Sequence, residues 1–241
     1  KIYPYIQLAI IAVFLFVSYL AFSASRKSEQ NRVWVGLAKE TAHQLGTPIS
    51  SLLAWIEHLK LKISTQEISI VDEMENDVKK LEIVADRFSK IGSVPVLKPE
   101  NVYETLERNI AYIKKRTSEK ITFEITGDPT IHAQVNASLF DWVIENLCNN
   151  AINAIGIQGA IKLAISQQKN KVFIDISDTG AGIPKSKFET VFEPGYTTRK
   201  RGWGLGLSLA KRIIENYHNG QIAVKESVLG KGSTFRITLY A

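Results

Sequence analysis

Residues 138–155, with the sequence SLFDWVIENLCNNAINAI, decide the fold because they form one helix with two unlike stripes. Apolar side chains at helical spacing predict a face that packs into a core. They are Val143, Leu147, Ala151 and Ala154. Beside them, Asn146, Asn150 and Asn153 follow the spacing i, i+4, i+7 and form a polar stripe. Asparagine is a poor helix former, and a merely solvated face would more readily carry Lys or Glu. Neutral carboxamide oxygens suit Mg²⁺ when the ligand supplies the negative charge.

Around this helix, strand and helix patterns alternate and predict an α+β domain over residues 100–241. We expect a two-layer α/β sandwich with helices on one face of a sheet. Helical patterns lie at residues 102–115, 138–155 and 207–217, and strand patterns at 121–126, 131–135, 161–167, 171–177, 221–226 and 233–240. The stretch GSVPVLKP at 92–99 breaks the preceding pattern, so residues 93–99 are predicted to be a linker.

Two glycine-rich loops follow the strand at 171–177. The first, Asp178-Thr-Gly-Ala-Gly-Ile183, places a carboxylate beside two glycines. A buried carboxylate can accept from an amino group such as that of adenine, and glycine lets the backbone approach a ligand closely. The second, Gly202-Trp-Gly-Leu-Gly-Leu207, opens a helix whose N–H groups would face phosphates. One such loop could be a plain surface turn, but two of them downstream of the asparagine stripe indicate a nucleotide site.

The N-terminal run at residues 5–22 carries no charge and is just long enough to cross a bilayer as a helix. Basic residues follow it directly, at Arg26, Lys27 and Arg32. By the positive-inside rule the rest of the chain is expected in the cytoplasm. A signal peptide is the weaker alternative, because the apolar run is long and one basic residue precedes it. We predict a transmembrane anchor over residues 1–24, and expect a fragment because no Met precedes the span.

Residues 25–92 are predicted to form two helices joined by a break at residues 64–66. The second helix carries a heptad seam of Val71, Met74, Val78, Leu81, Ala85 and Phe88. The first carries two stripes at seven-residue spacing, Trp34, Thr41, Pro48, Trp55 and Ala38, Leu45, Leu52, Leu59. A hairpin alone cannot cover both faces, so a dimeric four-helix bundle is expected. The alternative is an intramolecular pair packed on the next domain.

His43 lies two residues after Thr41, so at about 100° per residue it points away from the seam. Thr47 lies on the same outer face. Taken alone, His43 could be a solvated surface histidine. Pro48 changes this, because a proline inside a helix removes an N–H and clashes with the carbonyl of Gln44. A kink beside His43 favours a helix that bends to admit a second domain or a partner.

Taken in order, these motifs resemble those of sensor histidine kinases of two-component systems. His43-Gln-Leu-Gly-Thr-Pro48 resembles their H box, Asn146-Leu-Cys-Asn-Asn-Ala151 their N box, and Asp178-Thr-Gly-Ala-Gly182 their G1 box. Residues 188–192 resemble the F box, 202–207 the G2 box, and 230–234 the final glycine motif. The resemblance covers the chain from about Arg32 to its end. It implies a dimerisation and histidine phosphotransfer hairpin followed by a GHKL-type ATP-binding domain.

The resemblance also implies roles for single residues. His43 would accept the γ-phosphoryl group of ATP, Thr47 would orient water for dephosphorylating the partner, and Asp178 would contact adenine. Asn150 would hold Mg²⁺, with Asn146 close to it. The other residues expected to contact the cofactor are Asn153, Gly180, Gly182, Ile183, Thr198, Arg199, Lys200, Gly202, Gly204, Leu205, Gly206, Leu207 and Thr234. Phosphohistidine would then pass to an aspartate in the receiver domain of a response regulator.

Gln44 departs from the family pattern, since many relatives have Asp or Glu directly after the histidine. Glutamine cannot take a proton. Its carbonyl can still accept a hydrogen bond from the imidazole N–H and fix the tautomer, so we expect activity.

Charge and composition exclude some other functions. The net charge of +6 comes with no Lys/Arg run interleaved with aromatics, so no direct nucleic-acid partner is expected. The single Cys148 excludes an internal disulfide framework.

Two alternative functions remain. The first is another enzyme with this ATP fold, such as a protein-serine kinase, and the second is a non-enzymatic dimeric scaffold. His43 with Pro48 argues against the first, and Asp178 argues against the second. We expect a homodimeric kinase at the inner (cytoplasmic) membrane of a bacterium, with its catalytic part in the cytoplasm.

Overall fold

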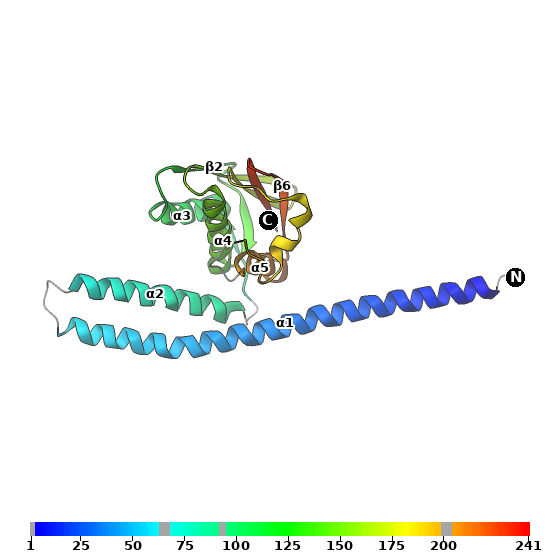
Figure 1. Ribbon diagram of the computed structural model, residues 1–241, viewed down its shortest axis with the longest axis horizontal. Coiled ribbons are helices and arrows are strands. Elements are labelled where there is room, and N and C mark those ends of the chain that lie inside the picture. Colours follow the sequence, from blue (N-terminus) through cyan, green and yellow to red (C-terminus); the bar gives the residue numbers. More distant parts are fainter. Residues whose placement is uncertain (1–2, 63–67, 92–94, 199–203) are drawn as a thin grey trace. The chain divides into compact units, whose positions relative to one another are not determined.

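The computed structural model describes residues 3–62, 68–91, 95–198 and 204–241 (Figure 1). The chain divides into two compact units, Lys1–Ser93 and Val94–Ala241. The first is a helical hairpin and the second contains the sheet. The predicted break at residues 64–66 lies outside the described residues.

The first unit consists of α1 (Tyr3–Lys60) and α2 (Ile68–Ile91). Helix α1 continues through Pro48 without interruption. Among the described residues, one helical segment is long and apolar enough to cross a membrane, Tyr5–Phe22, with a mean hydropathy of 2.2 and none of it buried. A signal sequence would pass the same test, so the transmembrane anchor stays a proposal.

The two helices contact each other through a different stripe of α1 from those that the heptad spacing predicted. The buried cluster consists of Ile49, Ile56, Val71, Val78 and Ala85, with Leu53 packed against it. The second helix therefore uses its predicted positions Val71, Val78 and Ala85. On α1, however, the predicted positions Leu45, Leu52, Trp55 and Leu59 are exposed, as are Met74 and Leu81 on α2. The apolar side chains of the two helices therefore form two separate stripes. One is buried inside the hairpin, and the other, the open seam, is exposed.

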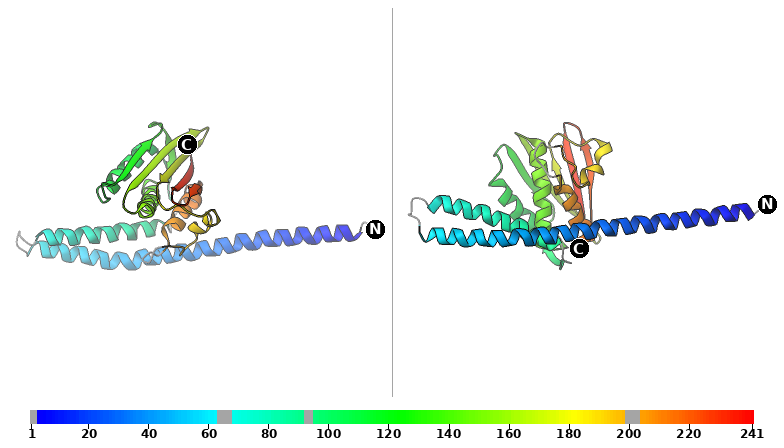
Figure 2. Two further views of the ribbon diagram at one scale, coloured as in Figure 1. Left: turned by 45° about the horizontal axis from the view of Figure 1, so that its top comes forward. Right: turned by 60° about the horizontal axis from the view of Figure 1, so that its bottom comes forward.

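The second unit has an α+β fold, as predicted. Its elements are β1 (Lys98–Asn101), α3 (Val102–Lys114), β2 (Ile121–Thr126), β3 (His132–Val135), α4 (Ala137–Ile155), β4 (Gly159–Gln168), β5 (Lys171–Asp178), η1 (Lys185–Lys187), η2 (Thr190–Phe192), α5 (Gly206–Arg212), η3 (Ile213–Tyr217), β6 (Gln221–Val228) and β7 (Gly232–Tyr240). The main sheet has the order β2-β4-β5-β7-β6. Its pairs are antiparallel except β2 with β4, which is parallel. Helices α3, α4 and α5 lie on one face of this sheet (Figure 2).

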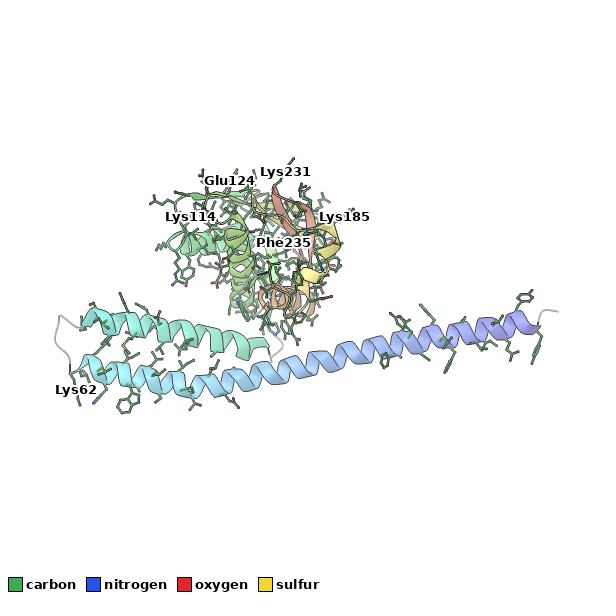
Figure 3. The ribbon with its side chains drawn as sticks, in the orientation of Figure 1. Lys62, Lys114, Glu124, Lys185, Lys231 and Phe235 are labelled. Atoms are coloured by element: carbon green, nitrogen blue, oxygen red, sulfur yellow. The ribbon has the colours of Figure 1, made fainter. Side chains whose placement is uncertain are left out.

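The core of this unit lies between the sheet and the helices. Leu163, Ile174 and Ile237 on the sheet, and Ile144 and Ile213 on the helical layer, are completely buried. Figure 3 shows Phe235 inside the unit, while Lys114, Glu124, Lys185 and Lys231 lie at its edge. The alternation of buried and half-buried residues along β5 explains why its strand pattern could be recognised in the sequence.

Three local features differ from the prediction. Lys98 and Pro99 were placed in the linker, but they begin β1, which pairs with β3 from Lys98 opposite Val135. The strand predicted at 131–135 therefore joins this small second sheet rather than the main one. The helix predicted at 207–217 changes at Ile213 from an α-helix to a π-helix.

Candidate nucleotide site

Asp178 ends β5 on the side of the sheet that faces the helices. The side chain is buried, with the residue 8% exposed, and its Oδ1 accepts a hydrogen bond of 2.7 Å from the backbone N–H of Gly180. Burial raises the pKa of this carboxyl, while the backbone N–H groups of Gly180 and Ser233 oppose that shift. A buried carboxylate with accepting capacity left is a suitable partner for a ligand's amino group.

Glycines bring neighbouring backbone into close contact around Asp178. A Cβ on Gly180 would lie 2.5 Å from the carbonyl carbon of Ala154, and one on Gly182 would lie 2.3 Å from the carbonyl oxygen of Val228. Gly232 has φ +114° and its Cβ would lie 1.8 Å from the carbonyl oxygen of Asp178. Gly180 and Gly182 were predicted to contact the cofactor, whereas Gly232 was not, although it lies in the glycine motif at 230–234.

The asparagine stripe of α4 is only partly assembled into the site. Among the described residues, the buried Nδ2 of Asn146 has no hydrogen-bond partner, and its Oδ1 faces Gly206 at the start of α5, where a Cβ would lie 3.0 Å away. Asn150 is half-buried one turn further along. Asn153, by contrast, is exposed and donates to the carbonyl of Asn149 in its own helix. Asn146 and Asn150 therefore remain candidates for binding the cofactor, whereas the Asn153 amide is engaged in a hydrogen bond within α4.

The site extends along α4 between two anchored ends. At one end, the N–H of Ala181 donates to the carbonyl of Ala154 at 3.0 Å, which fixes the Asp178 loop to the last turn of the helix. At the other end, Gly206 faces Asn146. Eight residues of α-helix separate Ala154 from Asn146, a rise of about 12 Å. This spacing suits an elongated ligand with an amino-bearing ring at one end and an anionic group at the other.

A backbone hydrogen bond between Gly195 and Gly204 lies just before α5. The N–H of Gly195 donates to the carbonyl of Gly204 at 3.0 Å, and Gly204 has φ +64°. Leu205 and Leu207 are half-buried around the start of α5, and Thr198 is exposed. The predicted ligands Arg199, Lys200 and Gly202 lie outside the described residues. Gly195 was not singled out from the sequence, because an isolated glycine in a loop carries little signal.

Two further predicted contacts are engaged within the protein. The N–H of Ile183 donates to Ser227 Oγ at 2.7 Å. The hydroxyl of Thr234 lies 2.9 Å from that of Ser177, its partner in the β5–β7 register. The N–H of Ile183 and the hydroxyl of Thr234 are therefore both engaged in hydrogen bonds within the protein.

The oxygen-donor chemistry around α4 fits Mg²⁺ held together with a phosphate ligand. Within the described residues, no group of three or more His, Cys, Asp or Glu side chains could hold a metal by itself. Amide oxygens of Asn146 and Asn150 would have to act with the ligand's own oxygens, which is the usual way that Mg²⁺ is bound.

The residues predicted to carry the acceptor chemistry lie in the hairpin unit. His43 is within α1, but its side chain lies outside the described part of the structure. Gln44, Thr47 and Pro48 are exposed on the same helix. Downstream of the proline, Ser50 Oγ donates to the carbonyl of Gly46 at 2.9 Å.

Comparison with known proteins agrees with this geometry. Residues 136–241 match the family described as histidine kinase-, DNA gyrase B- and HSP90-like ATPase, which implies ATP as the ligand of this domain. Nitrogen regulation protein NtrY of Azorhizobium caulinodans is 26% identical over 230 residues, covering 89% of this chain and 30% of the relative. Sensory histidine kinase/phosphatase NtrB of Rhodobacter capsulatus is 27% identical over 232 residues, covering 90% of this chain and 64% of the relative. The chain thus spans less than two thirds of the length of either.

Solved structures of the histidine kinase ThkA are similar in fold. Its catalytic domain matches with a TM-score of 0.54 and 26% identity, over 60% of this chain and 95% of that one. ThkA in complex with the response regulator TrrA matches with a TM-score of 0.57 and 23% identity, over 91% of this chain and 66% of that one. The likeness in fold to the ThkA complex thus covers more of the chain than residues 136–241.

Proposed function

We propose that this chain is the kinase part of a two-component sensor, which uses Mg-ATP to phosphorylate His43 and passes the phosphoryl group to an aspartate of a response regulator. The observation that carries the proposal is the pair of anchored ends on α4. Asp178 lies at one end, and the unpartnered amide of Asn146 lies at the other. An adenine amino group at Asp178 and phosphates near Asn146 would give both side chains a hydrogen-bond partner.

The residues around α4 would bind and orient the nucleotide. Asp178 would accept from the adenine amino group and so offset part of the cost of its own burial. The amide of Asn146 would donate to a phosphate oxygen, because its Nδ2 has no partner in the described part of the chain. Asn150 would supply an oxygen to Mg²⁺, which when bound neutralises charge on the phosphates.

The hairpin would supply the nucleophile. A ring nitrogen of His43 attacks the γ-phosphorus through its lone pair, the bond from that phosphorus to the bridging oxygen breaks, and ADP leaves with the electron pair. The other ring nitrogen then loses its proton. Gln44 would accept a hydrogen bond from that second N–H and hold the reactive tautomer. Positioning supplies most of the catalysis in such transfers.

The same hairpin would hold the partners. The open seam of Leu45, Leu52 and Leu59 supports a homodimeric four-helix bundle, since these side chains are exposed on a single chain. ThkA was solved with a response regulator, and the name of NtrB includes phosphatase activity. We extend the response-regulator partner and the phosphatase activity to this chain, with Thr47 orienting the water that dephosphorylates the partner.

The helical segment Tyr5–Phe22 would anchor the chain in the bacterial inner membrane, with the kinase part in the cytoplasm.

The test is incubation of the full chain in detergent with Mg²⁺ and γ-labelled ATP. We expect label on the protein that is acid-labile and alkali-stable, and that is lost in His43→Ala and Asn150→Ala. His58→Ala is the matched control, since His58 is an exposed histidine on the same helix, and it should label normally. Label that survives in His43→Ala would show that another residue is the acceptor.

A further inference from the structure

His218 is a buried histidine that the proposed chemistry does not use, and both of its ring nitrogens are bonded to backbone. It directly follows η3 and is 3% exposed. Its Nδ1 lies 2.9 Å from the carbonyl oxygen of Ile213, and its Nε2 lies 3.0 Å from the backbone nitrogen of Asn136. A carbonyl can only accept, so Nδ1 carries the proton and Nε2 accepts from the N–H of Asn136. The neutral imidazole therefore satisfies both backbone groups.

The surroundings keep this ring neutral. Burial lowers the pKa of His218, and the carbonyl of Ile213, which accepts from Nδ1–H, opposes that shift. The ring of Phe140 lies beside it, with 6.4 Å between ring centroids. No charged side chain contributes to that shift among the described residues, so the acceptor on Nε2 persists at neutral pH.

The partner of His218 begins the helix that carries the site. Asn136 is the N-cap of α4, and its Oδ1 accepts from the N–H of Leu139 at 3.2 Å. Ten residues later on the same helix, Asn146 faces Gly206. Gly206 and His218 bound the α5–η3 segment. The two helical segments therefore meet at two points about 15 Å apart along α4, one at His218 and one at the nucleotide site.

Asn136 also contacts the segment by which the chain reaches this unit. Its Nδ2 donates to the carbonyl of Val96 at 3.3 Å. Just beyond, Lys98 pairs with Val135, the residue that precedes Asn136. One asparagine thus joins Val96 of the predicted linker, the first turn of α4 and His218.

We propose that His218 is a positioning residue for the nucleotide site. Through Asn136 it holds the first turn of α4 against the end of the α5–η3 segment, and so keeps Gly206 in place against Asn146. This rests on the proposed function in one respect, namely that ATP is the ligand of that site.

Two substitutions separate positioning from simple stability. The amide of His218→Gln reaches the place of Nε2 and can accept from Asn136, whereas the shorter amide of His218→Asn reaches the place of Nδ1 and keeps only the local bond to Ile213. In the full chain we expect His218→Gln to bind Mg-ATP within about threefold of wild type, and His218→Asn to bind about tenfold more weakly, the worth of one buried hydrogen bond. The KM for ATP should rise in parallel, while the labelling rate at saturating ATP stays within about twofold.

The control is His132→Asn, an exposed histidine on β3 that bonds only to Thr130 among the described residues, and its ATP affinity should not change. Equal affinities of folded His218→Gln and His218→Asn would overturn the positioning role. Failure of the wild-type chain to bind ATP would instead overturn the proposed function itself. If His218→Asn does not fold, nitrogen NMR of the wild type decides. Saturating ATP should shift the signals of His218 Nε2 and of the Asn136 amide, and unchanged signals would overturn the inference.

Discussion

The two units of this chain treat their apolar side chains in opposite ways. In the sheet unit, the two layers bury the apolar side chains between them, and even the carboxylate of Asp178 is turned inward. In the hairpin, Ile49 and Ile56 are buried, whereas Leu52 and Leu81 are 45% and 52% exposed. The sheet unit therefore completes a core of its own, while the hairpin leaves an apolar face exposed. A substitution should accordingly act on fold and ligand in the first unit, and on assembly in the second.

The largest effect is expected from Gly232→Ala. The new Cβ would overlap the carbonyl oxygen of Asp178 at 1.8 Å, on a backbone with φ +114°. Strain and overlap together should lower the free energy of unfolding of the sheet unit by about 4 kcal/mol and abolish ATP binding. Urea unfolding followed by circular dichroism measures this, and the transition that ATP raises identifies the sheet unit.

The matched control for this change is Gly230→Ala. Gly230 also has positive φ, at +74°, but a Cβ there would meet nothing within 4 Å. Only the backbone strain remains, so the free energy of unfolding should fall by about 1 kcal/mol. Equal losses for the two variants would mean that the backbone at Asp178 can move away, and that the close contact is not required.

Asp178→Asn should separate ligand binding from stability. The amide keeps an acceptor for the N–H of Gly180 but cannot carry charge, so ATP affinity should fall about 100-fold, the worth of a charge-assisted hydrogen bond. Because the pKa of Asp178 is raised in the folded protein, its ionisation costs folded-state stability at every pH above that raised value. The substitution removes this cost, so the free energy of unfolding at pH 7 should stay the same or rise.

Asp175→Asn is the contrasting variant on the opposite face of β5. Burial alone would raise the pKa of Asp175, but hydrogen bonds from Arg236 and Lys225 outweigh it and lower the pKa. Its ionised form therefore stabilises the fold, and replacing it should lower the free energy of unfolding without changing ATP affinity. Calorimetry of ATP binding and urea unfolding of both variants test the contrast, and weaker ATP binding in Asp175→Asn would contradict it.

Sequence reasoning was most successful where a local pattern has a single physical solution. The alternation from Lys171 onward predicted β5. The glycines after Asp178 were predicted to let the backbone approach a ligand, whereas the close contact that Gly180 makes is with the backbone of Ala154. It missed Gly232 because the clash that excludes a side chain there comes from Asp178, which lies far away in sequence. It also misassigned the α1 face inside the hairpin. Heptad spacing identifies neighbouring apolar stripes, but it does not say whether Ile56 or Leu52 meets α2, since that depends on the rotation of the helix.

The hairpin itself can be tested by changing those two stripes separately. Ile56→Ala removes a side chain from the buried cluster and should lower the free energy of unfolding of the hairpin by about 2 kcal/mol. Leu52→Lys should leave the folded monomer nearly unchanged but convert the expected dimer into monomers. Analytical ultracentrifugation and urea unfolding measure the two effects. A Leu52→Lys chain that remains dimeric would show that the open seam is not the dimer interface.

The smallest effect is expected from the charges at the end of the hairpin. Lys60 of α1 forms salt bridges with Asp72 and Glu75 of α2, and Lys79 also forms one with Glu75.

Hydrogen bonds from Lys60 and Lys79 lower the pKa of Glu75 to about 2. A carboxyl with a lowered pKa in the folded state stabilises the fold above its unfolded pKa of 4.5. That contribution should disappear as the pH falls from 4.5 toward 2. Lys60 and Glu75 are half-buried at the surface, where water and salt still screen their charges, so Lys60→Met should shift the melting temperature only slightly, and less still in 1 M salt. A melting temperature that drops as far in Lys60→Met as in Ile56→Ala would show that charge, rather than the buried cluster, determines how the two helices pair.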